Sequence, residues 1–242
     1  MLSDNPVLFL AMSAPEAGSE RDQSGRGHTA RYSGSTAATA TLPDGELCAR
    51  FDGRSQYLEV PDADDLSITT TRRLTIEAWI RPDGLEFPTQ ESSGYVHWMG
   101  KGESGQHEYV LRMYSLTNTE ARPNRVSGYA FNAAGNLGSG SYFQDPVAVG
   151  EWIHVAVAFN LDDFPTDTPP GSVKIYKNGV LRDTTPLSQF QVVPANGTAP
   201  LRIATRDRRS YFLGAIGKVA IYDRDLAAAQ ILGHYQEMTT RR

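Results

Sequence analysis

Two neighbouring segments, GEWIHVAVAFN at residues 150–160 and GSVKIYKNGVLR at residues 171–182, decide the fold class of this chain. In the first segment every second residue from Ile153 onward is large and apolar, a period-2 pattern that predicts a strand with one buried face. The second segment alternates in the same way and turns at Asn178-Gly179, a dipeptide that favours type I′ hairpins because both central residues need a positive φ. A strand and a hairpin that each have an apolar side to cover predict a second sheet packed against the first.

The remaining sequence repeats this alternation and contains one helical segment. Residues 226–237 carry apolar side chains at near-helical spacing behind Asp225, which predicts a helix with Asp225 as its N-cap, covering an edge or end of the sheets. We expect Trp79 to be buried between the sheets. No fixed-period repeat or long linker is present in the 242 residues, so a single all-β domain is expected. Further strands are predicted within residues 7–12, 58–60, 73–82, 95–115, 126–131 and 141–149.

Composition excludes several classes of protein. The formal net charge is −5, which argues against a generic nucleic-acid or anionic-membrane binder. A single cysteine, Cys48, excludes an internal disulfide framework and a cysteine-cluster metal site. No apolar run approaches the roughly 18 residues of a membrane-spanning helix, so membrane insertion is not expected. The short run Val7–Met12 lacks the basic flank of a signal peptide and is interpreted as a strand.

The order of several motifs resembles the concanavalin A-like lectin/glucanase superfamily, and more narrowly bacterial laminin G-like (LamG-type) jelly-roll domains. The resemblance covers about residues 6–236 of a single domain spanning residues 1–242. It implies a two-sheet antiparallel jelly-roll sandwich of six or seven strands per sheet, one of them concave, with a short C-terminal helix and the N-terminal strand near the C-terminal one. It also implies an extracellular or cell-surface setting, although no signal peptide is recognisable. The motifs are DQSGRGHTARYSG (22–34), FDGRSQYLEVP (51–61), LTIEAWIRP (74–82), GKGESGQHEYVL (100–111), the two opening segments, LRIATR (201–206) and FLGAIGKVAIYDRDL (212–226).

The resemblance also raises the question of a structural Ca²⁺ ion. In many such domains the ion binds the loop that matches Asp22 to His28, and an aspartate on the last strand completes the site. In this chain Gly217 takes the place of that aspartate and Lys218 follows it, two changes that weaken a Ca²⁺ site. Three interpretations remain: a retained calcium site at Asp22 and His28, an Asx-type turn without an ion, or a Lys218–Asp22 pair that replaces the ion.

Catalytic patterns are incomplete. A retaining glucanase needs two carboxylates about 5 Å apart, but Glu77 has no acidic partner two or four residues away. A jelly-roll polysaccharide lyase needs a His/Tyr pair with Arg or Gln beside it; suitable residues are present, yet the signature segments of the alginate-lyase branch are not recognisable. The laminin G-like pattern routinely has a histidine at the position of His154, which favours a structural role for it.

Carbohydrate binding needs aromatic faces and planar hydrogen-bonding groups on the concave sheet or its rim. The favoured function is therefore a non-catalytic carbohydrate-binding or adhesion module with a glycan or cell-surface partner. A protein-interaction or scaffold domain without a sugar ligand is the alternative, followed by a diverged lyase or hydrolase. A basic patch at Arg206, Arg208 and Arg209 is either a solvated loop or a contact for an anion or acidic sugar. The candidate ligand-binding residues are His97, Trp98, Arg112, Tyr114 and Tyr142.

Overall fold

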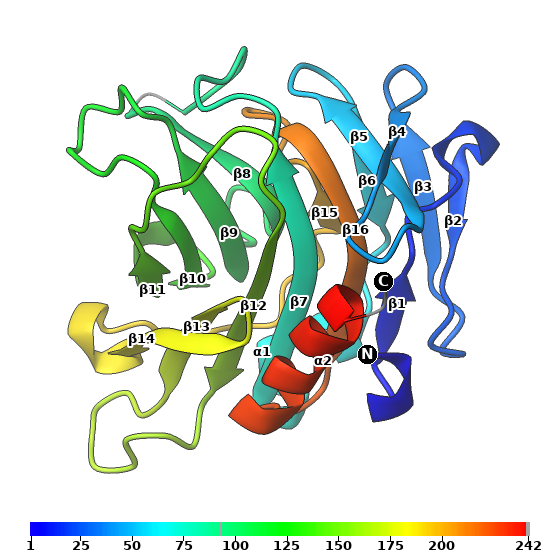
Figure 1. The fold of residues 1–242 in the computed structure, drawn as a ribbon. Helices are drawn as coiled ribbons and strands as arrows, with labels where there is room; N and C mark the ends of the chain where they lie inside the picture. Colours follow the sequence, from blue (N-terminus) through cyan, green and yellow to red (C-terminus); the bar gives the residue numbers. More distant parts are fainter. Residues whose placement is uncertain (92, 241–242) are drawn as a thin grey trace.

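The computed structural model describes residues 1–91 and 93–240 as two antiparallel sheets packed face to face (Figure 1). The first, sheet A, contains β1 (Leu8–Leu10), β4 (Ala38–Thr41), β5 (Leu47–Asp52), β7 (Arg73–Pro82), β12 (Ile153–Asn160), β13 (Ser172–Lys177), β14 (Val180–Pro186) and β16 (Leu213–Tyr222). The second, sheet B, contains β2 (Ser19–Arg21), β3 (Thr29–Ser33), β6 (Tyr57–Val60), β8 (Tyr95–Lys101), β9 (Tyr109–Tyr114), β10 (Val126–Asn132), β11 (Gly135–Phe143) and β15 (Leu201–Ile203). The predicted jelly-roll sandwich is confirmed.

The strand order places consecutive hairpins side by side and brings distant segments together. Sheet A runs β14-β13-β12-β7-β16-β5-β4 with β1 paired to β16, and sheet B runs β11-β10-β9-β8-β15-β6-β3-β2. Each sheet has eight strands, more than the expected six or seven, because three-residue strands such as β1 and β15 join the ladders. The pairing of Leu8 with Ile221 sets the N-terminal strand beside the last strand, as the resemblance implies.

The turn at Asn178-Gly179 forms as predicted. Asn178 has φ 53° and Gly179 has φ 80°, the two positive values of a type I′ turn. The turn also braces the neighbouring strand, because the Asn178 side chain accepts a hydrogen bond from the His154 backbone N–H at 3.0 Å. The hairpin β13–β14 is thereby held in register against β12.

The core lies between the sheets, where the inward side chains of β12 meet those of β9. Val155, Val157 and Phe159 belong to the same buried cluster as Leu111 and Met113. Every residue of β12 is buried, including the alternate positions that face away from this core. A second layer must therefore cover the outward face of sheet A.

That layer is helix α2 (Ala228–Thr240), which lies across the outward face of sheet A (Figure 1). The predicted position at an edge or end of the sandwich was wrong. Small outward residues, Ala156 and Ala220, allow the helix to approach, and Ile231 packs into the same cluster. Among the described residues, neither α2 nor the single-turn α1 (Ile68–Thr71) is long and apolar enough to cross a membrane. Short 3₁₀ helices occupy Leu2–Asp4, Pro15–Ala17, Asp64–Leu66 and Leu187–Phe190.

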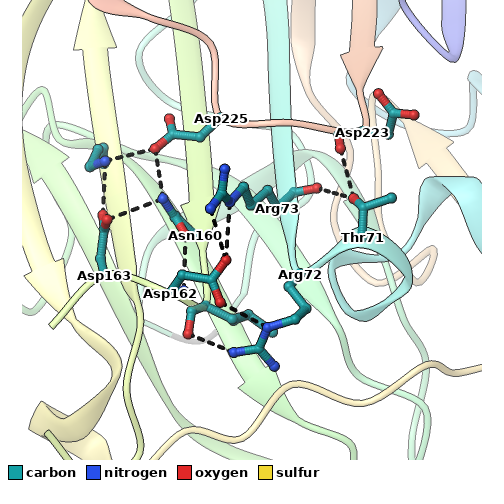
Figure 2. A network of polar contacts seen from close by, with 10 residues as sticks. Thr71, Arg72, Arg73, Asn160, Asp162, Asp163, Asp223 and Asp225 are labelled. Carbon is teal, nitrogen blue, oxygen red and sulfur yellow. Dashed lines mark hydrogen bonds and ion pairs between the residues drawn. The ribbon is translucent and has the colours of Figure 1, made fainter. Parts of the chain in front are cut away.

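Asp225 does not cap the helix as predicted. Its carboxylate accepts hydrogen bonds from Lys174 Nζ at 2.8 Å and Asn160 Nδ2 at 3.0 Å, within the polar network that anchors the segment between β16 and α2 (Figure 2). The helix starts three residues later, where the Ala227 N–H donates to the Gln230 side chain at 3.1 Å. The N-cap prediction was wrong, because the Asp225 carboxylate binds side chains of the neighbouring strands β12 and β13 instead of the helix.

Beneath α2 lies a buried group of ionisable and aromatic side chains. Trp79 is buried there, stacked on Tyr235 at 5.8 Å, and not between the sheets as expected. Glu77, fully buried, contacts His234 Nδ1 at 2.7 Å, and His234 Nε2 contacts an oxygen of Asp4 at 2.7 Å. The histidine thus joins two carboxylates, one from the sheet and one from the N-terminal segment, and ties the helix to both.

Candidate functional site

The outward face of sheet B is hollowed by a groove of about 880 Å³. Strands β8, β9, β10 and β11 form its floor, while residues 120–122 and 183–185 form its rim. No α-helix covers this face in the part of the chain that the structure describes, in contrast to sheet A. The groove is therefore an accessible concave surface of the size that ligands occupy.

Strand parity explains which side chains reach the groove. Along β9, Tyr109, Leu111 and Met113 point into the core. The alternate residues Arg112 and Tyr114 therefore point outward and line the groove. The alternation predicted for this strand is confirmed.

Arg112 lies at the centre of the floor, surrounded by aromatic rings. Its guanidinium carbon is 4.6 Å from the ring centroid of Tyr95, 4.8 Å from that of Tyr129 and 5.4 Å from that of Phe131. Each such cation–π contact stabilises by roughly 0.5–2 kcal/mol, depending on desolvation. Arg112 forms no ion pair with any described residue, and its Nε has no hydrogen-bond partner. The rings hold the cation in place without neutralising it.

A second arginine is held in the same way. The guanidinium carbon of Arg125 lies 3.3 Å from the ring centroid of Tyr142 and 5.8 Å from that of Tyr114. Arg125 also lacks an acidic partner among the described residues, and its Nε is unpaired. Arg122 donates to the Tyr114 hydroxyl at 3.1 Å and forms an ion pair with Glu120. Three arginines therefore face one groove.

Two glycines on β11 make room for the aromatic rings. A Cβ atom at Gly140 would lie 2.3 Å from Cδ1 of Tyr129, and one at Gly138 would lie 2.7 Å from Cε1 of Phe131. Real Cβ atoms do not approach other atoms this closely, so only glycine at both positions allows the rings to lie flat against the strand. The shape of the floor thus depends on two residues without side chains.

The carboxylates of the groove are both engaged. Glu120 is paired with Arg122, and Asp183 accepts hydrogen bonds from the backbone N–H groups of Tyr142 at 3.1 Å and Thr184 at 2.9 Å. Burial raises the pKa of Tyr129, so this hydroxyl remains a neutral hydrogen-bonding group at physiological pH. With three arginines against two acids, the groove is suited to binding a planar or anionic group.

Three of the five predicted ligand-binding residues, Arg112, Tyr114 and Tyr142, line this groove. His97 is 1% exposed and lies behind Tyr95, with 5.4 Å between the ring centroids. The prediction that Trp98 binds a ligand was wrong, because this residue is fully buried in the core and cannot reach a surface ligand. The register of β8 shifts between residues 97 and 99, so strict alternation does not hold at this point.

Several groove residues were not selected from the sequence. Tyr95, Arg125, Tyr129 and Phe131 all line the groove. Arg112 faces outward, and counting every second residue on the neighbouring antiparallel strands would have identified the aromatic residues of the groove. Gly138 and Gly140, two residues apart, would have identified the strand against which these rings lie.

The carboxylate of Asp22 is held by hydrogen-bond donors of its own loop and of β1. Its Oδ1 accepts hydrogen bonds from the N–H groups of Phe9 at 3.0 Å and Ser24 at 2.9 Å, and its Oδ2 accepts from the Ser24 hydroxyl at 2.7 Å and the His28 N–H at 3.2 Å. Burial alone would raise the pKa of Asp22, but these donors lower it overall. The His28 ring faces Asp65 at 3.2 Å instead of Asp22. Both carboxylate oxygens of Asp22 are therefore satisfied within the chain, and the calcium site stays a prediction.

The predicted pair between Lys218 and Asp22 is wrong. Lys218 has φ 51° in a register shift of β16 and pairs with Glu46, with Asp44 at 3.9 Å. A Cβ atom at Gly217 would lie 2.5 Å from Cβ of Cys48, so no aspartate fits there without displacing β5. Asp22 is stabilised by its own loop and by β1, without a cation from the last strand.

Comparison with known proteins places this architecture in a family. The sequence model of the Laminin_G_3 family, described as the concanavalin A-like lectin/glucanases superfamily, matches residues 52–232, about three quarters of the chain. A search of the curated proteins found no significant match.

Similar solved structures include receptor-binding portions of botulinum neurotoxins. A structure of type C, whose cell entry depends on two ganglioside molecules, has a TM-score of 0.69 at 13% identity, covering 98% of this chain and 52% of that one. The binding domain of neurotoxin DC in complex with SialylT has a TM-score of 0.69 at 15% identity, covering 98% and 52%. The same domain with rat synaptotagmin II has a TM-score of 0.67 at 14% identity, covering 98% and 52%. The chain spans about half the length of these structures, and the likeness is one of fold. On the family match and the fold, this chain belongs to the concanavalin A-like lectin/glucanase superfamily as a laminin G-like domain.

Proposed function

We propose that this chain is a carbohydrate-binding module that holds an acidic glycan in the groove over β8–β11. The observation that carries the proposal is the pair Arg112 and Arg125, two cations fixed on aromatic rings with no carboxylate partner among the described residues. A guanidinium group binds a carboxylate or sulfate through two parallel hydrogen bonds. An uncharged sugar would leave both charges without a partner.

The aromatic rings supply the second requirement of sugar binding. Tyr142 is 40% exposed at the groove and offers a surface to the C–H face of a pyranose ring. The groove is open along β9–β11 and is lined on both sides by hydroxyl and amide groups, including Thr184 and Gln144, which can bind sugar hydroxyls. Ganglioside and SialylT ligands of the structurally similar neurotoxin domains support this class of ligand. An extracellular or cell-surface setting follows from the same proposal.

Protein binding is the second candidate function. Leu137, 68% exposed, and Phe190, 41% exposed, line the same groove and would suit an apolar peptide side chain. One neurotoxin domain of the same fold is in complex with a protein, rat synaptotagmin II. The arginines favour the acidic glycan over this alternative, because an apolar partner would bury their charge.

The test is a glycan array that contains matched acidic and neutral oligosaccharides, read with the wild-type chain and with Arg112→Ala/Arg125→Ala. We expect binding to uronate, sialylated or sulfated glycans that the double variant loses, with folding checked by circular dichroism. The matched control is Arg31→Ala, an exposed arginine on β3 of the same sheet and outside the groove.

Three outcomes contradict the proposal. No binding to any acidic glycan excludes it, and equal binding to neutral glycans excludes the acidic specificity. Binding that survives the double variant excludes the groove. Release of unsaturated fragments from a uronate polysaccharide would instead identify a lyase.

A further inference from the structure

A second cluster of side chains lies beside the groove, where the loop before β8 meets the loop after β15. It consists of Glu91, His97 and Asp207, which come from three separate segments of the chain. His97 Nδ1 is 3.9 Å from Glu91 Oε1 and 3.8 Å from Asp207 Oδ1. The three ligand atoms all lie within 4.8 Å of one another.

Several buried nitrogen and oxygen atoms of this cluster have no hydrogen-bond partner among the described residues. His97 is 1% exposed, and neither ring nitrogen has a hydrogen-bond partner among the described residues. Glu91 Oε1 is buried and unpaired as well. An unsatisfied buried polar atom costs about 1–3 kcal/mol.

A divalent cation between the three atoms would satisfy all of them. One neutral imidazole nitrogen and two carboxylate oxygens suit Zn²⁺, which binds such ligands at about 2.0–2.2 Å. Tetrahedral coordination would place the ligand atoms roughly 3.4 Å apart. The observed nitrogen–oxygen distances of 3.8 and 3.9 Å exceed this by about 0.5 Å. Binding would require the two carboxylates to rotate, because the three ligand atoms, all within 4.8 Å of one another, must come closer together.

The surroundings hold one of these ligands in position. Arg206 donates to Asp207 Oδ2 at 2.7 Å, and the Arg209 N–H donates to Oδ1 at 3.3 Å. Hydrogen bonds of this kind orient metal-binding carboxylates in proteins. Arg206 contacts the far oxygen, so it does not occupy the space between Asp207 and His97. Asp207 also lines a hollow of about 260 Å³ that contains His107 and offers access from solvent.

We propose that Glu91, His97 and Asp207 form a Zn²⁺ site with a fourth coordination position open to water or to a ligand. The ion would join the loop before β8, which carries Glu91, to the loop after β15, which carries Asp207. This site is separate from the loop at Asp22, and it does not depend on which ligand the groove binds.

The test uses the tag-free chain after dialysis against EDTA. Isothermal titration calorimetry with ZnCl₂ should show one equivalent of binding. Glu91→Gln should weaken the binding roughly tenfold or more. This variant is the sharpest, because the Glu91 oxygen in the cluster has no hydrogen-bond partner whose loss could unfold the protein. His97→Gln should weaken the binding in the same way. The visible absorption of Co²⁺ bound in place of Zn²⁺ depends on the coordination geometry and should change in the same two variants.

Two histidine variants are the controls. His28→Gln removes a histidine that contacts Asp65 at 3.2 Å in another part of the fold, and His107→Gln removes the one in the adjacent hollow. Both should keep one equivalent of Zn²⁺. The proposal is overturned if the wild type binds no Zn²⁺, if Glu91→Gln binds as tightly as wild type, or if His107→Gln abolishes binding. Titrations with Ca²⁺ and Mg²⁺ complete the test, since binding of these ions in preference to Zn²⁺ contradicts the assigned ion.

Discussion

The outward faces of the two sheets carry similar kinds of residues but differ in how charge is balanced. On sheet A, Glu77, Trp79 and His154 lie under α2, and Glu77 is paired with His234. On sheet B, Arg112 and Arg125 lie on aromatic rings beside an open groove with no carboxylate partner among the described residues. On sheet A the charged Glu77 is paired with a residue of the helix. On sheet B the described chain supplies no carboxylate partner for the two arginines.

This difference separates a structural cluster from a binding site better than residue type does. Aromatic and ionisable side chains mark both faces equally in the sequence. The side chains on sheet A have a structural role because α2 covers them, and a buried charge is stable only when it is paired. On sheet B the partly exposed Arg112 and the largely buried Arg125 lie on aromatic rings at the groove without a carboxylate, and this leaves their charges for a ligand.

The largest expected effect is on the free energy of unfolding, when the pair of Glu77 and His234 beneath α2 is broken. Glu77→Ala should lower the free energy of unfolding by about 3–5 kcal/mol, because it leaves His234 buried without its carboxylate from the sheet. Urea denaturation followed by tryptophan fluorescence measures this change. The matched variant on the open face, Glu120→Ala, removes a partly exposed ion pair and should cost less than about 1 kcal/mol. Equal losses for the two variants would remove the distinction between the faces.

A smaller effect is expected from changing the cation of the open face without removing its charge. Arg112→Lys keeps the charge but loses the planar group that lies against Tyr95 and Tyr129. If the groove binds an acidic glycan, affinity should fall about tenfold, or about 1.4 kcal/mol. Calorimetric titration of the best acidic ligand from the array checks this, with Arg31→Lys as the control. An unchanged affinity would mean that charge alone is recognised.

The pH dependence of stability offers a third comparison. Burial alone would lower the pKa of His234, but hydrogen bonds and charge interactions with Glu77, and a hydrogen bond with Asp4, raise it overall above the ordinary 6.5. A raised pKa means that the folded state holds the proton more tightly. The resulting stability is complete below pH 6.5 and is lost as the pH rises through the pKa of the folded state.

The variant His234→Gln isolates this contribution. The difference in unfolding free energy between wild type and variant should be largest in mildly acidic buffer and should shrink as the pH rises. Burial lowers the pKa of His154 to about 4, so that residue acts in the opposite direction below pH 6.5. The charge of His234 also lowers the pKa of His154, so this opposing effect is smaller in the variant. A difference that grows with pH would contradict the assignment of a protonated His234.

The smallest effect is expected from Glu120→Gln at the rim of the groove. The change releases Arg122 from its ion pair and removes one negative charge from the rim. Affinity for an acidic oligosaccharide should increase about two- to threefold, corresponding to about 0.5 kcal/mol. The gain should disappear in high salt, because an exposed charge is screened. A neutral glycan serves as the control ligand.

Most of the fold could be predicted from the sequence because strand alternation and turn chemistry are local. β12, the Asn178-Gly179 turn and the alternation of β9 were all predicted correctly. The position of α2 was not, since a helix that covers a face and one that covers an edge have the same amphipathic pattern. Trp79 was misplaced for the same reason: the sequence does not specify which side of a sheet a distant helix covers.

The candidate site was only partly predictable. Arg112, Tyr114 and Tyr142 follow from parity and chemistry, whereas Trp98 was chosen for its aromatic ring although it shares the parity of Val96, which lies in the core. Arg125 was missed because it lies just outside a strand, where parity gives no direction. The cluster of Glu91, His97 and Asp207 depends on contacts between residues far apart in the chain, which spacing does not reveal.

The place of β16 in sheet A has a consequence for biosynthesis. This strand, close to the end of the described chain, pairs with β7 on one side and with β5 and β1 on the other. Strands β1, β5 and β7 are synthesised first and therefore cannot form their hydrogen bonds with β16 until residues 213–222 have been made. Long-range pairing of this kind slows folding and exposes unpaired strand edges in the meantime. A nascent chain that stalls before β16 would leave sheet A in separate pieces and would be a natural target for chaperones.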